Sequence, residues 1–242
     1  MSDSLGQFTV IVPAAGVGKR MLSSCPKQYL TIDNITILEH TVQRLLSHDA
    51  ISHIIIALGE HDEYFPSTSL ANKHNISCVV GGKERVDSVL SGLQQLSAGQ
   101  NQWVLVHDAA RPCIQHKDLT RLIAYCLKND HGGILASPVR DTMKQANTEQ
   151  LVEATLERSQ MWHALTPQMY KTVELTSAIT SALAKGFSIT DESSAMEALG
   201  YKSGLVSSSS DNIKITQPED LFLAEFILNQ QKNNLASEAI CE

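Results

Sequence analysis

Short runs of apolar residues alternate along this chain with segments in which apolar residues recur every three or four positions. The runs lie at residues 9–12, 53–58, 76–80, 103–107 and 133–139, and their length and β-branched content predict buried strands. The intervening segments, 38–46, 86–96 and 119–127, carry the apolar stripe of amphipathic helices. This alternation predicts an α/β fold with a mostly parallel sheet, helices on both faces and ligands beyond the carboxyl ends of the strands. The loops after Val12, Val80 and His107 should therefore converge.

The pattern changes beyond residue 138, where two mostly polar, strand-like stretches, 139–145 and 151–156, are joined by residues 146–150. They predict a protruding hairpin. Because an isolated two-stranded hairpin is marginal in water, this arm is expected to pack on a second subunit of a homodimer. The alternative is an edge hairpin folded on its own domain. We interpret residues 1–242 as a single domain with residues 138–160 as a dimerisation arm.

The remaining chain predicts a helix around residues 170–184, a short helix starting near Asp191, a strand at 204–207 and a helix opening at 218–220. A length of 242 residues with 43% apolar residues suffices for a full core. No run approaches the roughly 18 apolar residues of a membrane span. The five cysteines are scattered without a C-x-x-C pair, which favours a soluble protein of the reducing cytoplasm.

The formal net charge of −7 argues against nucleic-acid binding, which usually needs a continuous basic face. Basic residues nevertheless gather near the start of the chain, after the Gly81-Gly82 pair and in stretches otherwise poor in charge. Small anionic ligands suit this distribution. The alternative is that these side chains are simply solvated surface residues.

The segment PAAGVGKR, residues 13–20, directly follows the first predicted strand. Its small residues let backbone N–H groups approach a triphosphate. A Walker A loop would need Gly at Pro13 and Ser or Thr at Arg20, and a dinucleotide fingerprint would need a small residue at Met21. Arg20 and Lys27 place two cations beside this loop, which suits charge that builds on a phosphorus under attack. The loop therefore indicates nucleotidyl transfer.

Asp108 is the candidate metal ligand. It closes a predicted strand within HDAARP, residues 107–112, where a carboxylate can hold Mg²⁺ against phosphate oxygens. The alternative is a helix cap or turn residue. For His107 and His163 we favour structural or orienting roles.

Several motifs in order make the chain resemble the 2-C-methyl-D-erythritol 4-phosphate cytidylyltransferase family of the non-mevalonate isoprenoid pathway. They are PAAGVGKR at 13–20, CPKQY at 25–29, GGKER at 81–85 with Asp87-Ser88, VHDAARP at 106–112, PVRDT at 138–142, WHALTPQ at 162–168, TDE at 190–192 and DNIK at 211–214. The first loop is shared by many nucleotidyltransferases, whereas the full set is specific. The resemblance covers residues 10–226 and implies a Rossmann-like, GT-A-like nucleotidyltransferase fold.

The resemblance also implies roles for individual residues. CTP contacts fall to Ala14, Ala15, Gly16, Gly18, Gly82, Ser88 and Ala109. Arg20 and Lys27 stabilise the transition state, and Asp108 binds Mg²⁺. The positions implied for methylerythritol phosphate, some of them across the dimer interface, are Arg111, Thr142, Arg158, Thr166 and Lys214. Lys83 departs from the pattern, because some relatives carry an acidic residue there near the base pocket; backbone groups can serve instead.

The implied nucleophile is a substrate phosphate oxygen that is already anionic near neutral pH, so no general base is required. Asp191 and Glu192 have the composition of a helix N-terminus and are left out of the catalytic set. Three alternatives remain open: a cytidylyltransferase for another polyol phosphate such as ribitol 5-phosphate, a nucleotide-binding regulatory protein without turnover, and, weakened by Met21, a dinucleotide-dependent oxidoreductase.

Overall fold

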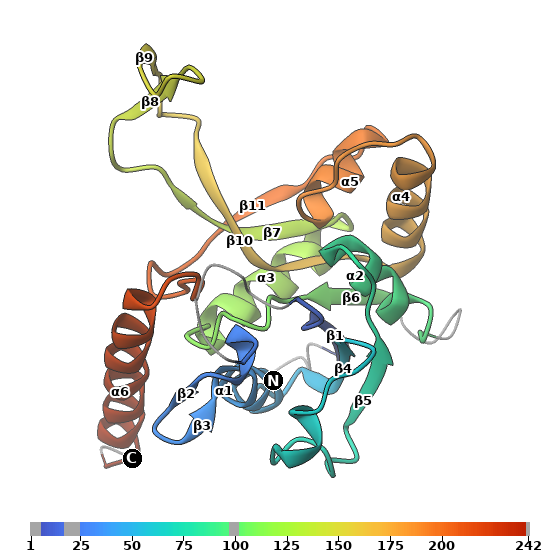
Figure 1. The fold of residues 1–242 in the computed structure, drawn as a ribbon, viewed down its shortest axis with the longest axis vertical. Coiled ribbons are helices and arrows are strands. Elements are labelled where there is room, and N and C mark those ends of the chain that lie inside the picture. Colours follow the sequence, from blue (N-terminus) through green and yellow to red (C-terminus); the bar gives the residue numbers. More distant parts are fainter. Residues whose placement is uncertain (1–5, 17–24, 97–101, 241–242) are drawn as a thin grey trace.

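A seven-stranded sheet forms the centre of the molecule (Figure 1). The computed structural model describes residues 6–16, 25–96 and 102–240. In spatial order the strands are β11 (Gly204–Ser207), β7 (Gly133–Pro138), β10 (Trp162–Lys171), β6 (Trp103–Val106), β1 (Phe8–Pro13), β4 (Ile51–Leu58) and β5 (Ile76–Val80). Every neighbouring pair is parallel except the two that involve β10. The predicted mostly parallel α/β sheet is confirmed.

Strand β10 is the main departure from the sequence prediction. Residue Tyr170 was expected to open a helix, but it lies in β10, and α4 (Thr172–Ala184) begins two residues later. Pro167 obscures the strand in the sequence, because proline is disfavoured within central strands. The pairing of β10 with β7 is interrupted between Ala164 and Gln168, where this proline lies. The ring of Tyr170 is buried so closely against Gly132 that a Cβ there would lie 2.0 Å from a ring carbon.

Helices cover both faces of the sheet, as the alternation predicts. On one face α1 (Ile37–Leu46) and α3 (His116–Asn129) share a hydrophobic core with the strands. On the other face lie α2 (Arg85–Leu93), α4 and α5 (Glu192–Ala198). The helix α2 ends three residues before Leu96, the last residue of its apolar stripe.

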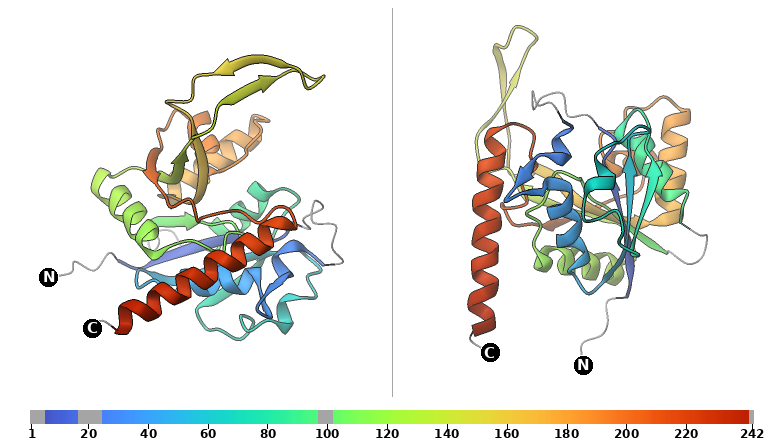
Figure 2. Two further views of the ribbon diagram at one scale, coloured as in Figure 1. Left: turned by 90° about the vertical axis from the view of Figure 1, so that its left-hand side faces the viewer. Right: turned by 60° about the horizontal axis from the view of Figure 1, so that its bottom comes forward.

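The long helix α6 (Glu219–Ile240) lies along one side of the body (Figure 2). Ala224, Ile227 and Leu228 bury its inner face in a third apolar cluster that includes Ile32 and Ile37. Two short elements that the sequence did not predict, β2 (Thr31–Ile32) and β3 (Ile35–Thr36), form a small hairpin that leads into α1. Two 3-10 helices, η2 (Lys27–Tyr29) and η3 (Phe65–Ser67), complete the elements. Within the described residues no helix is long and apolar enough to cross a membrane.

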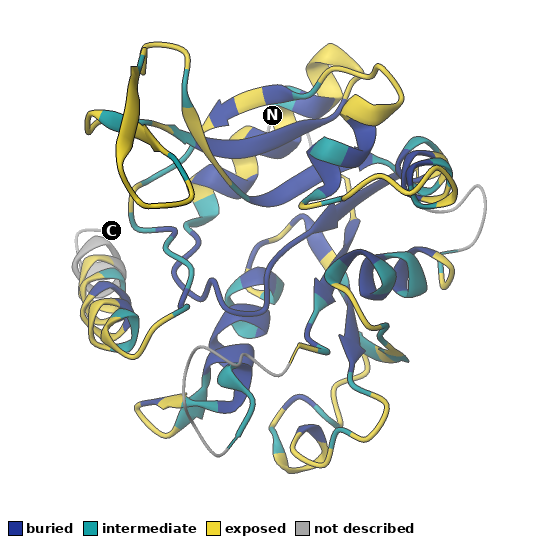
Figure 3. Cartoon of the chain, turned by 45° about the horizontal axis from the view of Figure 1, so that its top comes forward, coloured by how far each residue is buried: buried dark blue, intermediate teal, exposed yellow. Residues whose placement is uncertain are grey.

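The predicted hairpin arm is present. It consists of β8 (Met143–Ala146) and β9 (Val152–Leu156), which pair with each other and project from the body (Figure 1). The first strand is shorter than the predicted 139–145. The arm is almost entirely exposed (Figure 3), including apolar Leu151 at 59% and Val152 at 65%. A hairpin with exposed apolar residues and no core of its own has an unused packing surface.

Candidate active site

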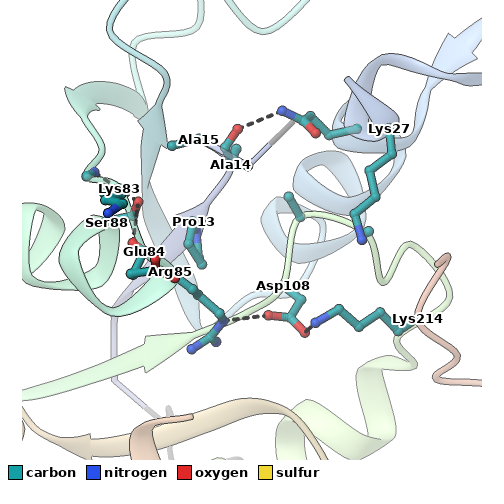
Figure 4. A pocket seen from close by; sticks show the side chains of 15 residues that line it. Pro13, Ala14, Ala15, Lys27, Lys83, Glu84, Arg85, Ser88, Asp108 and Lys214 are labelled. Atoms are coloured by element: carbon teal, nitrogen blue, oxygen red, sulfur yellow. Dashed lines mark hydrogen bonds and ion pairs between the residues drawn. The ribbon is translucent and has the colours of Figure 1, made fainter. Parts of the chain in front are cut away.

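Strand β1 is the point at which the order of successive strands across the sheet reverses. From β1 the chain passes through α1 to β4 on one side, and later returns through α2 to β6 on the other side. Such a switch point leaves a crevice at the carboxyl ends of the strands. A cavity of about 170 Å³ lies there (Figure 4). Its lining comes from the loops after β1, β5 and β6, from η2 and from Lys214, so the predicted convergence of the three loops is confirmed.

The loop after β1 forms one wall through Pro13, Ala14, Ala15 and Gly16. Ala14 is fixed from two sides: its N–H donates to the Ala57 carbonyl at 2.8 Å, and its own carbonyl accepts from Gln28 Nε2 at 2.7 Å. Small side chains keep this wall open to a ligand. The predicted Gly18 and Arg20 lie outside the described residues.

Gly82 and Ser88 form a second part of the lining, at the junction of β5 and α2. The Gly82 N–H donates to Ser88 Oγ at 3.1 Å. A Cβ on Gly82 would lie 2.2 Å from the Cβ of Asp87, so only glycine fits there. Asp87 also accepts the backbone N–H of Glu84 at 3.0 Å and caps α2. The turn after β5 and the first turn of α2 are therefore held together by these contacts.

Lys27 and Lys83 bring positive charge to the same cavity. Lys27 stands on η2, and its Nζ donates to the Ile215 carbonyl at 3.1 Å. Lys83 is exposed on the loop before α2, next to Glu84, which also lines the cavity. An acidic side chain is thus present in the cavity lining, one residue beyond Lys83.

Asp108 is the centre of the site's electrostatics. Its Oδ1 pairs with Arg85 Nε at 3.0 Å, and its Oδ2 pairs with Lys214 Nζ at 2.8 Å (Figure 4). The same Oδ2 lies 3.4 Å from Arg111 Nε. Burial at 6% exposure would raise the pKa of this carboxyl, but the three cations hold that pKa well below its usual range. Asp108 is therefore ionised at neutral pH.

The residues present suit Mg²⁺ only together with phosphate oxygens. Within the described residues no group of three or more His, Cys, Asp or Glu side chains could hold a metal ion on its own. Mg²⁺ commonly binds one or two carboxylates and completes its shell with water and substrate phosphates. A single ionised carboxylate beside a cationic cavity, as Asp108 provides, fits that use.

A second cavity, of about 230 Å³, adjoins the first and shares Arg85, Asp108 and Lys214 with it. Three of the predicted substrate residues, Arg111, Thr166 and Lys214, line this cavity together. Asn212 connects the segments of Arg111 and Thr166 by two hydrogen bonds. Its carbonyl accepts from Arg111 Nη1 at 2.7 Å, and its Nδ2 donates to the Thr166 carbonyl at 2.8 Å.

His107 contacts two residues of the second cavity and has 0% of its surface exposed. Its Nε2 contacts the Arg111 carbonyl and its Nδ1 contacts Thr166 Oγ1, both at 3.1 Å. Burial lowers its pKa to about 4, so the imidazole is neutral near pH 7. These contacts support the orienting role expected for it, whereas His163 is exposed.

Two predicted site residues are not brought together with the rest. Thr142 and Arg158 lie at the base of the arm and are exposed, and neither lines the two cavities. The Arg158 guanidinium donates instead to the Arg140 carbonyl. Within one chain the arm does not complete the site.

Arg85 is a site residue that the sequence prediction omitted. It lines both cavities, and besides Asp108 it binds Glu192 through Nη1 at 2.6 Å and Nη2 at 3.1 Å. Its sequence signal was a basic residue soon after Gly81-Gly82 at the end of a strand. Its partner is 107 residues away, and no local pattern reveals that pairing.

Comparisons with known proteins agree with this geometry. The sequence profile of the family described as 2-C-methyl-D-erythritol 4-phosphate cytidylyltransferase matches residues 8–230. Among proteins of that name, the one from Colwellia psychrerythraea (strain 34H) is 58% identical over 236 residues, covering 94% of this chain and 97% of the relative. The one from Vibrio vulnificus (strain CMCP6) is 54% identical over 235 residues, covering 96% and 99%.

Solved structures show the same likeness. The crystal structure of the Francisella tularensis 2-C-methyl-D-erythritol 4-phosphate cytidylyltransferase superposes with a TM-score of 0.81 at 32% identity, covering 92% of this chain and 100% of that one. The protein of the same name from Thermus thermophilus gives 0.76 at 28% identity, covering 91% and 98%. The chain belongs to the 2-C-methyl-D-erythritol 4-phosphate cytidylyltransferase family.

Proposed function

We propose that this protein transfers the cytidylyl group of CTP to 2-C-methyl-D-erythritol 4-phosphate, giving 4-diphosphocytidyl-2-C-methyl-D-erythritol and pyrophosphate in the non-mevalonate isoprenoid pathway. One observation carries the proposal: two adjoining cavities share Asp108 and Lys214, one lined by the small-residue loop after β1 and the other by Arg111 and Thr166. Two phosphate-bearing substrates would meet at these shared residues. Family membership over residues 8–230 supports the same substrates.

The reaction requires one bond to form and one to break. A phosphate oxygen of methylerythritol phosphate attacks the α-phosphorus of CTP, and the bond from that phosphorus to the bridging oxygen of pyrophosphate breaks with its electron pair on pyrophosphate. The attacking oxygen is already ionised, so the protein contributes position and charge. Lys27, together with Arg20 on grounds of sequence, would stabilise the negative charge of the transition state.

The nucleotide would occupy the first cavity. Its described contacts would be Ala14, Ala15, Gly16, Gly82, Ser88 and Ala109, all of which line that cavity, and the sequence adds Gly18. The open wall after β1 suits the triphosphate, and the Gly82 turn suits the nucleoside, where backbone groups rather than the Lys83 side chain would read the base.

Asp108 would hold Mg²⁺ when CTP is bound. The bound ion would neutralise phosphate charge and polarise the phosphorus under attack. For this contact Asp108 must be ionised, which its three cationic neighbours ensure. Lys214 is then placed to bind phosphate in exchange for the carboxylate.

Methylerythritol phosphate would occupy the second cavity, held by Arg111, Thr166 and Lys214. Thr142 and Arg158 would reach the same substrate from the arm of a second subunit in a homodimer. The exposed apolar residues of the arm support this assembly. The four cysteines in the described part of the chain are free thiols, which supports a place in the reducing cytoplasm.

Pyrophosphate release by the purified protein, with CTP and Mg²⁺ present, tests the function directly. We expect turnover with 2-C-methyl-D-erythritol 4-phosphate and little with ribitol 5-phosphate. Turnover with ribitol 5-phosphate alone would overturn the choice of substrate. CTP binding without pyrophosphate release from either polyol phosphate would favour a regulatory protein.

Lys27→Ala tests the proposed role of the cation on η2. We expect kcat to fall by about 100-fold or more, because the variant removes a preorganised charge from the transition state. Lys73→Ala, which removes an exposed lysine away from both cavities, serves as the matched control. Undiminished pyrophosphate release by Lys27→Ala would exclude this role.

A further inference from the structure

Glu192 is a buried carboxylate that lines neither cavity. It is the first residue of α5, has 2% of its surface exposed, and receives both terminal nitrogens of Arg85, at 2.6 and 3.1 Å. A buried ion pair often contributes little net stability, because both charges lose their hydration. The position of this pair against the active site suggests another use.

Arg85 divides its guanidinium between two carboxylates. Nη1 and Nη2 face Glu192, and only Nε reaches Asp108, at 3.0 Å from Oδ1. Arginine prefers to bind a carboxylate with two parallel N–H groups. The fork to Glu192 uses one N–H of each Nη atom and fixes the plane of the guanidinium, so that its Nε edge faces Asp108.

The backbone under Glu192 is itself fixed. Asp191 caps α5 by accepting the Ser194 N–H at 2.9 Å. The amide of Gln168, buried in β10, accepts the Ser193 N–H at 2.9 Å and donates to Asp191 Oδ2 at 2.8 Å. These bonds join the start of α5 to the central sheet, so Glu192 presents its carboxylate from a rigid support.

We propose that Glu192 is a positioning residue, which acts through Arg85 to set the orientation of Asp108 for the nucleotidyl transfer. The chain of contacts runs from β10 through α5 and α2 to the loop after β6. Without Glu192 the guanidinium is no longer held in this plane, so the contact from Nε to Asp108 Oδ1 is lost and the carboxylate is less well oriented toward a divalent cation. This inference rests on the proposed function for its kinetic consequence.

Glu192→Gln removes the charge that holds the Arg85 fork. We expect kcat/KM for CTP to fall roughly tenfold or more, as for other residues that orient a metal ligand. The Mg²⁺ concentration that gives half of the CTP-induced rise in melting temperature should increase by a similar factor. Glu225→Gln, which changes an exposed carboxylate on α6, is the control and should change neither quantity.

A double variant separates positioning from stability. Arg85→Met with Glu192→Leu replaces the ion pair by apolar side chains of similar size, and such replacements often preserve or raise stability. We expect a melting temperature near that of the wild type with kcat/KM still reduced. Glu192→Asp, which keeps the charge, should recover part of the loss.

The outcomes are distinguishable from failure of the proposed function. If the wild type turns over and Glu192→Gln retains its kcat/KM and its Mg²⁺ dependence, the positioning role is wrong. The role is equally wrong if the double variant is fully active. If the wild type releases no pyrophosphate, the proposed function fails, and the melting-temperature titration with CTP and Mg²⁺ still decides whether Glu192 controls Asp108.

Discussion

At the scale of single residues, His107 couples the site to the stability of the fold. The imidazole is fully buried between the Arg111 carbonyl and the Thr166 hydroxyl. Burial lowers its pKa from 6.5 to about 4, because no solvent remains to hydrate the charged ring. Protonating it in the folded protein would bury a cation beside Arg111 and disturb the second cavity.

This shift predicts a pH dependence of unfolding. The folded pKa lies below the unfolded one, so between pH 6.5 and 4 the unfolded chain binds a proton that the native state does not. The neutral buried His107 therefore contributes fully to the free energy of unfolding above pH 6.5, and this contribution is lost as the pH falls toward 4. At 1.36 kcal/mol per pKa unit, the loss is about 3 kcal/mol. Urea unfolding at several pH values should show a shallower dependence in His107→Gln than in the wild type. His74→Gln, at an exposed histidine, should match the wild type.

At the scale of elements, the junction of β5 and α2 joins secondary structure to ligand binding. The Gly82 N–H bonds Ser88 Oγ, and Asp87 caps the same helix. The backbone at Gly82 passes so close to Asp87 that the turn, the cap and the cavity wall cannot move independently. This close packing gives a physical reason for two glycines at the end of this strand, where the sequence implied a contact with CTP.

Gly82→Ala should damage both stability and nucleotide binding. Its new Cβ would meet the Asp87 Cβ at 2.2 Å, and relieving this overlap should cost about 1–3 kcal/mol of unfolding free energy. Displacing the turn should also raise the Kd for CTP, measurable by calorimetry. Gly59→Ala is the control, because its Cβ would have nothing nearer than 3.8 Å. Unchanged CTP affinity in Gly82→Ala would contradict the placement of the nucleoside at this turn.

At the scale of the whole molecule, the formal charge of −7 contrasts with a site that gathers Lys27, Arg85, Arg111 and Lys214 around Asp108. The net charge argued against a nucleic-acid-binding surface, but it left room for a local anion site. Two predicted substrate residues of the arm, Thr142 and Arg158, lie outside the two cavities of their own chain. A complete site therefore requires a second subunit under the proposed function.

Mixing two inactive variants tests that requirement. In a dimer of Lys27→Ala and Arg158→Ala chains, one site receives both wild-type residues, and random exchange makes half of the dimers mixed. Equal mixing should therefore restore roughly a quarter of the wild-type activity. Pyrophosphate release measured before and after subunit exchange reports this recovery. No recovery in demonstrably mixed dimers would show that Arg158 acts within its own chain or not at all.

The sequence predicted the elements whose patterns are local. Apolar runs or helical stripes mark the strands β1, β4, β5, β6, β7 and β11 and the helices α1, α2 and α3. The convergence of three loops followed from the parallel order of the strands. In contrast, β10 has no clean alternation and contains Pro167. It is a strand because β6 and β7 bond to its two edges, and partners supplied by distant segments leave no local trace.

By itself the sequence determined the fold class and the family, and it predicted a phosphate-binding loop after β1, because glycines, small residues and spaced cations express local requirements. Only the tertiary structure decided how charges pair. Asp108, Arg85 and Glu192 come from three segments, and their linkage depends on which elements become neighbours after folding. Coulomb interactions fall with distance in space rather than along the chain, so the network that orients the site appears only once the sheet has brought those segments together.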